Sequence, residues 1–118
     1  MTKSKVTIFH NPACGTSRRV LGMIEAAGMA PEIVLYLKTG WTRPQLLFLL
    51  ASMKARPRDI LRKRGTPAEE LGLLAADTTD DAILDAMVAH PVLVERPIVV
   101  TPRGAKLCRP AETVEDLL

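Results

Sequence analysis

The chain has 118 residues, 47% of them hydrophobic and 25% charged, which suits one globular domain, residues 1–118, with a hydrophobic core of its own. Its net charge is +3, its pI is about 9.1, and only 3% of its residues are aromatic. The basic residues are spread along the chain and no apolar stretch approaches the ~20 residues of a membrane span, so we expect neither nucleic acid nor membrane as a partner.

The first elements predict a strand–helix–strand unit. Residues 6–9 are apolar and β-branched and predict a buried strand, which Asn11-Pro12 ends. Thr16 or Ser17 can cap the following helix, and Gly28 can end it. Residues 33–35 predict a second strand. Because a helix connects the two strands within about 30 residues, we expect them to be parallel.

The middle of the chain predicts helices. Leucines recur at helical spacing in residues 43–53, and Pro57 opens a short turn through residue 61. Residues 69–74 and 80–89 predict two further short helices. Thr79 can cap the second of these, with acidic residues in its first turn, and His90-Pro91 ends it.

The last third predicts a β-hairpin and a closing helix. Residues 98–100 and 105–108 are the two strands, with Pro102-Arg103-Gly104 as the turn between them, and Pro110 starts the helix. The order βαβ, helices, ββα predicts an α/β fold: a thioredoxin- or glutaredoxin-like four-stranded mixed sheet with a helical insertion between its halves.

Cys14 follows a strand and directly precedes a helix N-terminus, where unpaired N–H groups and the helix dipole stabilise an anion. Cysteine pKa values at such positions fall to about 3.5–7.5. Arg18 adds positive charge in the first turn. The alternative is a cysteine that merely fills a tight loop, but the placement favours a reactive thiolate or a bound oxyanion.

The other candidates around this thiol leave alternatives open. A dithiol motif would place a second cysteine at position 17, which is Ser17, so the electrons must come from Cys108 or from an external thiol such as glutathione. A strand cysteine like Cys108 is usually packed in the core. His10 can stabilise a thiolate as a cation or hydrogen-bond donor, or can simply end its strand.

Arginine suits a tetrahedral oxyanion because its planar guanidinium gives paired, charge-assisted hydrogen bonds. Arg96 and Arg109 lie at the boundaries of buried strands, and Arg62 lies in a basic cluster that is otherwise typical of a solvated surface. Two histidines and two scattered cysteines make no ligand set, so we predict no metal and no bound cofactor. With no visible signal peptide, we expect free thiols in a cytoplasmic monomer.

Four segments together resemble the arsenate reductases of the ArsC family that use glutathione and glutaredoxin and have a thioredoxin-like fold. The segments are residues 10–18, 61–63, 95–102 and 107–110. The resemblance implies that Cys14 attacks arsenate and that His10 helps to keep it ionised. It also implies an arsenate- and arsenite-binding arginine triad, a cis-proline beside the cysteine, and two supporting polar residues; these are Arg62, Arg96, Arg109, Pro97, Asn11 and Ser17.

The resemblance implies a reaction in which arsenate forms a thioarsenate on the cysteine and leaves as arsenite, with glutathione as co-substrate and glutaredoxin as a partner. Cys108 matches a family cysteine that the chemistry does not need. Two alternatives remain: a thiol-redox protein of the same family that acts on another substrate, and a regulator that binds a protein partner. The first would need Cys14 but not the arginines, and the second would need an exposed patch and a redox switch, which Ser17 does not supply.

Overall fold

The computed structural model describes residues 5–118. The chain forms two compact units: residues 5–39 with 96–118, and residues 40–95. The first contains the sheet and the second the helical insertion. No helix in the described range has the length and apolarity needed to cross a bilayer.

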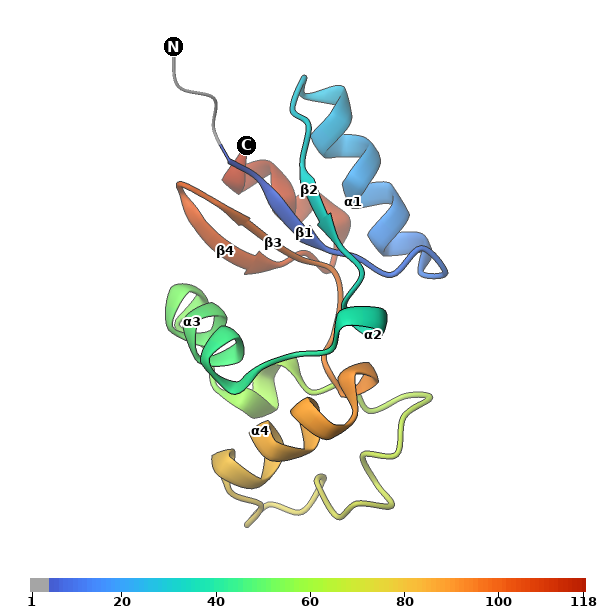
Figure 1. Cartoon of the computed structure of the whole chain (residues 1–118), viewed down its shortest axis with the longest axis vertical. Coiled ribbons are helices and arrows are strands. Elements are labelled where there is room, and N and C mark those ends of the chain that lie inside the picture. The colour runs from blue at the N-terminus through green and yellow to red at the C-terminus, as the bar shows by residue number, and fades with distance from the viewer. Residues whose placement is uncertain (1–4) are drawn as a thin grey trace. The chain divides into compact units, whose positions relative to one another are not determined.

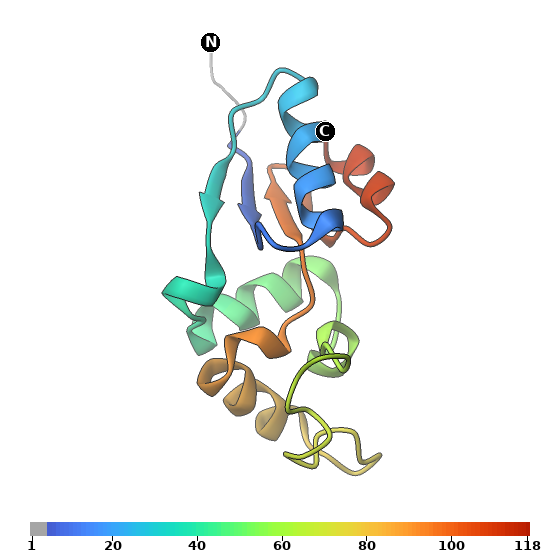
Figure 2. The same ribbon diagram turned by 90° about the vertical axis from the view of Figure 1, so that its right-hand side faces the viewer.

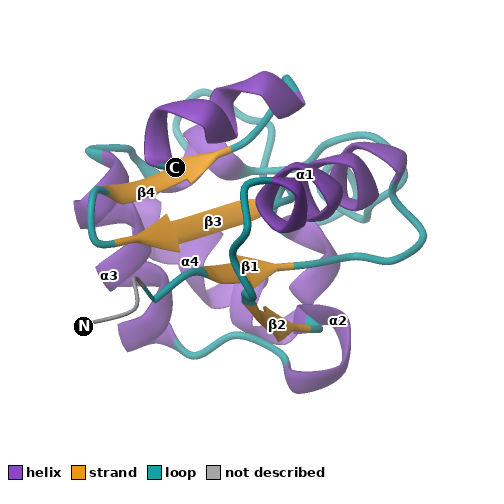
Figure 3. Ribbon diagram, turned by 90° about the horizontal axis from the view of Figure 1, so that it is seen from above, coloured by secondary structure: helices purple, strands orange, loops and turns teal. Residues whose placement is uncertain are grey.

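The sheet of the first unit has four strands in the order β2-β1-β3-β4 (Figures 1 and 3). Parallel pairing joins β1 to β2, and antiparallel pairing joins β1 to β3 and β3 to β4. The predicted parallel pair, hairpin and mixed four-stranded sheet are therefore confirmed. The strands are β1 Thr7–Phe9, β2 Glu32–Val34, β3 Ile98–Thr101 and β4 Gly104–Leu107.

Helix α1 (Gly15–Ala26) and the 3₁₀ helix η3 (Ala111–Leu117) lie together over one face of this sheet (Figure 2). Alternate strand residues point to this face because successive side chains in a strand point to opposite sides. The core between them is apolar and closed to solvent: Val6, Ile8, Val20, Ile24, Val99, Cys108, Ala111, Val114 and Leu117. The predicted closing helix is thus present, and Pro110 is its N-cap. A short helix, α2 (Tyr36–Thr39), follows β2.

The start of α1 differs from the prediction. Cys14 itself is the N-cap residue, with extended backbone and no side-chain capping bond, so the expectation of a Thr16 or Ser17 cap was wrong. The hydroxyl of Ser17 has other partners, described below, and is not available to cap. Gly28 ends the helix as predicted, since its φ of 82° is a left-handed conformation that glycine adopts without strain.

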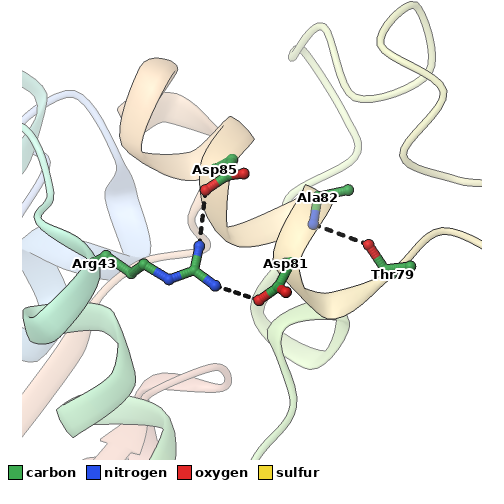
Figure 4. A network of polar contacts seen from close by, with 5 residues as sticks. All are labelled: Arg43, Thr79, Asp81, Ala82 and Asp85. Carbon is green, nitrogen blue, oxygen red and sulfur yellow. Dashed lines mark hydrogen bonds and ion pairs between the residues drawn. The ribbon is translucent and has the colours of Figure 1, made fainter.

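The second unit contains the expected helices α3 (Arg43–Met53) and α4 (Asp80–Ala89) and the 3₁₀ helices η1 (Pro57–Ile60) and η2 (Pro91–Leu93). Thr42 and Gln45 form a capping box at the start of α3, and Thr79 caps α4 by accepting a bond from the N–H of Ala82. Figure 4 shows Arg43 joining the two helices: its guanidinium donates to both Asp81 and Asp85, which lie one turn apart on α4.

The helix expected over residues 69–74 is absent: the chain forms successive turns there. Gly72 interrupts it with a φ of 74°, which no right-handed helix contains. The carbonyls of Pro67 and Ala68 each accept one bond from a residue four or five positions later, and the pattern goes no further. The spacing of the apolar residues therefore predicted a helix that does not form, in a segment whose side chains are mostly exposed.

Candidate active site

Cys14 lies where β1 leads into α1, at the positive end of the helix. The residue is 9% exposed, so most of it is shielded from solvent. A tight turn holds the residue, because the N–H of Cys14 donates to the carbonyl of Asn11 at 3.0 Å. The side chain of Asn11 closes the same turn by accepting from the N–H of Ala13 at 3.0 Å. The predicted strand–loop–helix setting of the thiol is therefore present.

Burial of the Cys14 thiol raises its pKa, but the groups around the sulfur outweigh this effect and lower the pKa below 9.0 in total. The N–H of Ser17 is the strongest of these groups, followed by the charge of Arg96, a hydrogen bond from Arg109 and the N–H of Thr16. Two of the four are backbone donors of the first helical turn, which have no carbonyl partner within a helix. The site thus favours a thiolate through the helix N-terminus and two arginines.

His10 contacts Ser17 rather than the sulfur. Its Nδ1 lies 2.6 Å from the Ser17 hydroxyl, and both side chains are buried. Burial lowers the pKa of His10 below 6.5, and the charge of Arg18 lowers it further. A neutral ring can accept the hydroxyl proton at Nδ1, while the Ser17 oxygen accepts the N–H of Asn11 at 3.1 Å. A cationic His10 is therefore disfavoured, and its influence on the Cys14 sulfur is indirect, through Ser17.

Arg109 reaches the sulfur directly. Its Nη1 lies 3.8 Å from Sγ of Cys14 and donates to the backbone carbonyl of Arg96 at 3.0 Å. Arg96 is half-buried and Arg109 is exposed, so one guanidinium is shielded and the other is open to an incoming anion. The peptide bond between Arg96 and Pro97 is cis, the form that the family resemblance implies.

Arg62 belongs to the second unit, and its part in the site stays a prediction. Its backbone is fixed by a short antiparallel pairing in which Leu61 lies opposite Val94 and the N–H of Arg62 donates to the carbonyl of Leu93 at 2.7 Å. In addition, the hydroxyl of Thr66 donates a hydrogen bond to the carbonyl of Arg62 at 2.8 Å. The local backbone of Arg62 is therefore well defined within its own unit.

Cys108 is fully buried in the core between the sheet and its two covering helices. Burial raises its pKa to about 12, so the thiol is protonated at neutral pH and is a poor nucleophile. Its sulfur contacts the carbonyl of Lys106 at 3.6 Å. These properties favour an external thiol over Cys108 as the source of electrons. Within residues 5–118 no three His, Cys, Asp or Glu residues are grouped so that they could hold a metal ion.

Two interactions were not foreseen from the sequence: the His10–Ser17 contact and a hydrogen bond from Arg18 to the carbonyl of Pro12 at 2.7 Å. Both join the cysteine loop to the first turn of α1. No spacing rule signals them, because the partners lie six or seven residues apart and one of them is a backbone group. The sequence singled out Ser17 as a possible helix cap, as a supporting residue and as the position where a second cysteine is missing, but it gave no sign of the contact with His10.

The comparisons with known proteins identify the family of this chain. The ArsC family model matches residues 9–117. An arsenate reductase of Synechocystis sp. is 57% identical over all of this chain and 82% of its own length, and the arsenate reductase of Escherichia coli K12 is 52% identical over 98% of this chain and 82% of its own. The solved structure of an arsenate reductase from Vibrio cholerae matches with a TM-score of 0.94 and 36% identity, over 99% of this chain and all of that one. The chain therefore belongs to the ArsC family and has its thioredoxin-like fold.

Proposed function

We propose that this protein is an arsenate reductase that uses Cys14 as its nucleophile. The observation that carries the proposal is the setting of the sulfur: two first-turn N–H groups and two arginines surround it and lower its pKa. The same groups that stabilise a thiolate also bind a tetrahedral oxyanion. The relatives that share this chain's sequence over nearly its whole length are arsenate reductases, which supports arsenic as the reacting atom.

In the first step, the Cys14 thiolate attacks the arsenic of arsenate. A sulfur–arsenic bond forms, an arsenic–oxygen bond breaks, and the oxygen leaves as water after protonation, so arsenic stays pentavalent. Arg96 and Arg109 neutralise the charge of the oxyanion and orient the arsenic toward the sulfur. Arg62 completes the arginine set in this scheme, an assignment that rests on the family resemblance.

His10 acts indirectly in this proposal. It holds Ser17, and the N–H of Ser17 is the strongest donor to the sulfur. A neutral, buried histidine with one fixed partner is suited to positioning rather than to proton transfer. Asn11 and Ser17 have the same supporting role, since both brace the turn that carries Cys14.

The electrons come from two molecules of glutathione in the second part of the proposal. Glutathione replaces a further oxygen on arsenic as water, and a glutaredoxin thiolate then attacks the glutathione sulfur. The electron pair of that sulfur–arsenic bond stays on arsenic, which becomes trivalent, and hydrolysis frees arsenite and Cys14. A second glutathione resolves the glutaredoxin disulfide. The inert environment of Cys108 supports an external donor of this kind.

The test is arsenite formation by purified protein with glutathione and glutaredoxin, and in parallel with thioredoxin in place of both. We expect activity with the first pair and none after Cys14→Ser, which removes the thiolate with little change in volume. Arg109→Ala should raise KM for arsenate, whereas Arg103→Ala, an exposed arginine of the β3–β4 turn, should not. Activity with thioredoxin alone would refute the reductant, and activity in Cys14→Ser would refute the mechanism.

The alternative within the family is a thiol-redox protein that acts on another substrate. It would depend on the Cys14 thiol but not on an arsenate-binding set of arginines, so the wild type would show general disulfide reduction and no arsenate-dependent activity. The regulatory alternative lacks support in the described residues, because Cys108 is buried and protonated and so offers no redox switch.

A further inference from the structure

Arg18 is exposed, yet its side chain has a defined place over the cysteine loop. Its Nη1 donates to the carbonyl of Pro12 at 2.7 Å, which closes a ring from the first turn of α1 back to the residue two before Cys14. A Cβ added to Gly15 would lie 3.8 Å from the other guanidinium nitrogen. The guanidinium thus lies across Gly15 and holds the loop from outside.

The loop has a second brace on its inner side. The buried Ser17 hydroxyl binds both His10 and the N–H of Asn11. Arg18 and Ser17 are adjacent in the first turn, so the inner and outer braces start from the same turn of helix and end on neighbouring loop residues. Along the chain, Cys14 lies within the segment that both braces close, and its sulfur is stabilised by N–H groups of this turn.

We propose that Arg18 is a positioning residue, which holds the Pro12 carbonyl so that the loop keeps Sγ of Cys14 against the N–H groups of the first helical turn. The hydrogen bonds from these N–H groups to Sγ are strong only when donor and acceptor are held in place. A loop released at Pro12 can move the sulfur away from its donors. Arg18 acts here through the backbone of the loop and does not touch the reacting atoms.

The charge of Arg18 has a second, supporting effect. It lies close enough to His10 to lower the pKa of that ring, after the larger effect of burial. The neutral ring accepts the Ser17 hydroxyl and keeps the inner brace intact. Outer and inner braces are therefore linked through one arginine.

The chain offers a matched control, because the next residue, Arg19, is also an exposed arginine in the first half of α1 but pairs with Glu112 on η3. We would measure the pH dependence of Cys14 alkylation by iodoacetamide in Arg18→Ala, Arg18→Lys and Arg19→Ala. In Arg18→Ala the midpoint should rise by roughly half a pH unit, as expected for one lost, partly solvated hydrogen bond. Arg18→Lys keeps a donor and a charge and should restore most of the shift, and Arg19→Ala should match the wild type.

Repeating the titration at about 1 M salt separates the effect of the Arg18–Pro12 hydrogen bond from the attraction between the charge of Arg18 and the thiolate. At this salt concentration the Debye length falls to about 3 Å, so the attraction is screened. A shift that persists supports the brace, and one that disappears overturns it. An unmoved midpoint in Arg18→Ala, or an equal shift in Arg19→Ala, also overturns it. These readouts need no arsenate, so they stand apart from the proposed function.

The expectation for turnover does rest on the proposed function. Arg18→Ala should lower kcat for arsenate reduction and leave KM nearly unchanged, because the loop sets the reactivity of the sulfur rather than the affinity for the anion. A raised KM together with an unaltered alkylation midpoint would make Arg18 a substrate ligand and would refute the positioning role.

Discussion

Replacing Ser17 by alanine removes one hydroxyl from the centre of the site and leaves the backbone donor to Cys14 in place. The hydroxyl is fully buried and has two partners, Nδ1 of His10 at 2.6 Å and the N–H of Asn11 at 3.1 Å. Each bond contributes about 1 kcal/mol, and the buried ring nitrogen left without a donor adds about 1 kcal/mol more. The better helix propensity of alanine offsets roughly 0.5 kcal/mol. We therefore expect a loss of about 2 to 2.5 kcal/mol in the free energy of unfolding.

Denaturant unfolding followed by circular dichroism measures this loss, with Thr16→Ala as the control. Thr16 lies in the same turn and also loses a hydroxyl, but that hydroxyl has no part in the His10 contact. The Cys14 thiol of Ser17→Ala should still have a pKa below 9.0, because the N–H of residue 17 remains. A loss below about 0.5 kcal/mol, or a loss equal to that of Thr16→Ala, would refute the brace that we assign to this hydroxyl.

Four further predictions follow from the same contacts. In native protein iodoacetamide should modify Cys14 and leave Cys108 unmodified until denaturant is added, as peptide mass mapping would show; modification of both in the native state would contradict the burial and the pKa of about 12 of Cys108. His10 has a lowered pKa in the folded state, so unfolded chains bind more protons and the free energy of unfolding should fall as the pH drops through about 6.5. In His10→Gln this part of the fall should be missing, and a pH profile identical to that of the wild type would contradict the lowered pKa of His10. Arg43→Met should cost about 0.5 to 1 kcal/mol in urea unfolding, since its two ion pairs are largely exposed, and a loss above about 2 kcal/mol would show that this estimate omits a contact. Phosphate should compete with arsenate in calorimetric titrations, because arginines and N–H groups recognise any tetrahedral oxyanion; tight arsenate binding without phosphate competition would refute this reading of the site.

Much of the fold could be predicted because local signals agreed with one another. The helix α3 carries leucines at helical spacing, and α4 begins with Thr79 and acidic residues, so both ranges were predicted to the residue. The hairpin of β3 and β4 has a proline and a glycine at its turn. Residues 69–74 had apolar spacing without a cap, and the left-handed Gly72 ended the turn before a helix formed.

The residues of the candidate site were easier to predict from the sequence than the contacts between them. Cys14 could be singled out because the sequence around it predicts a strand, a loop and the start of a helix. The role of Ser17 depends on which buried group meets its hydroxyl, and the role of Arg18 depends on a backbone carbonyl. Neither partner is encoded by residue type or local spacing. The prediction for Arg62 rests on the family motif alone, because a basic cluster in sequence is typical of solvated surface.

The most direct test of the central claim couples arsenate reduction to NADPH oxidation in the presence of glutathione, glutathione reductase and glutaredoxin, with arsenite quantified at the end. We expect oxidation that depends on arsenate, one arsenite formed per NADPH consumed, and no arsenite above background with Cys14→Ser. Oxidation that proceeds equally without arsenate, or arsenite formation that survives the loss of the Cys14 thiol, would contradict the account.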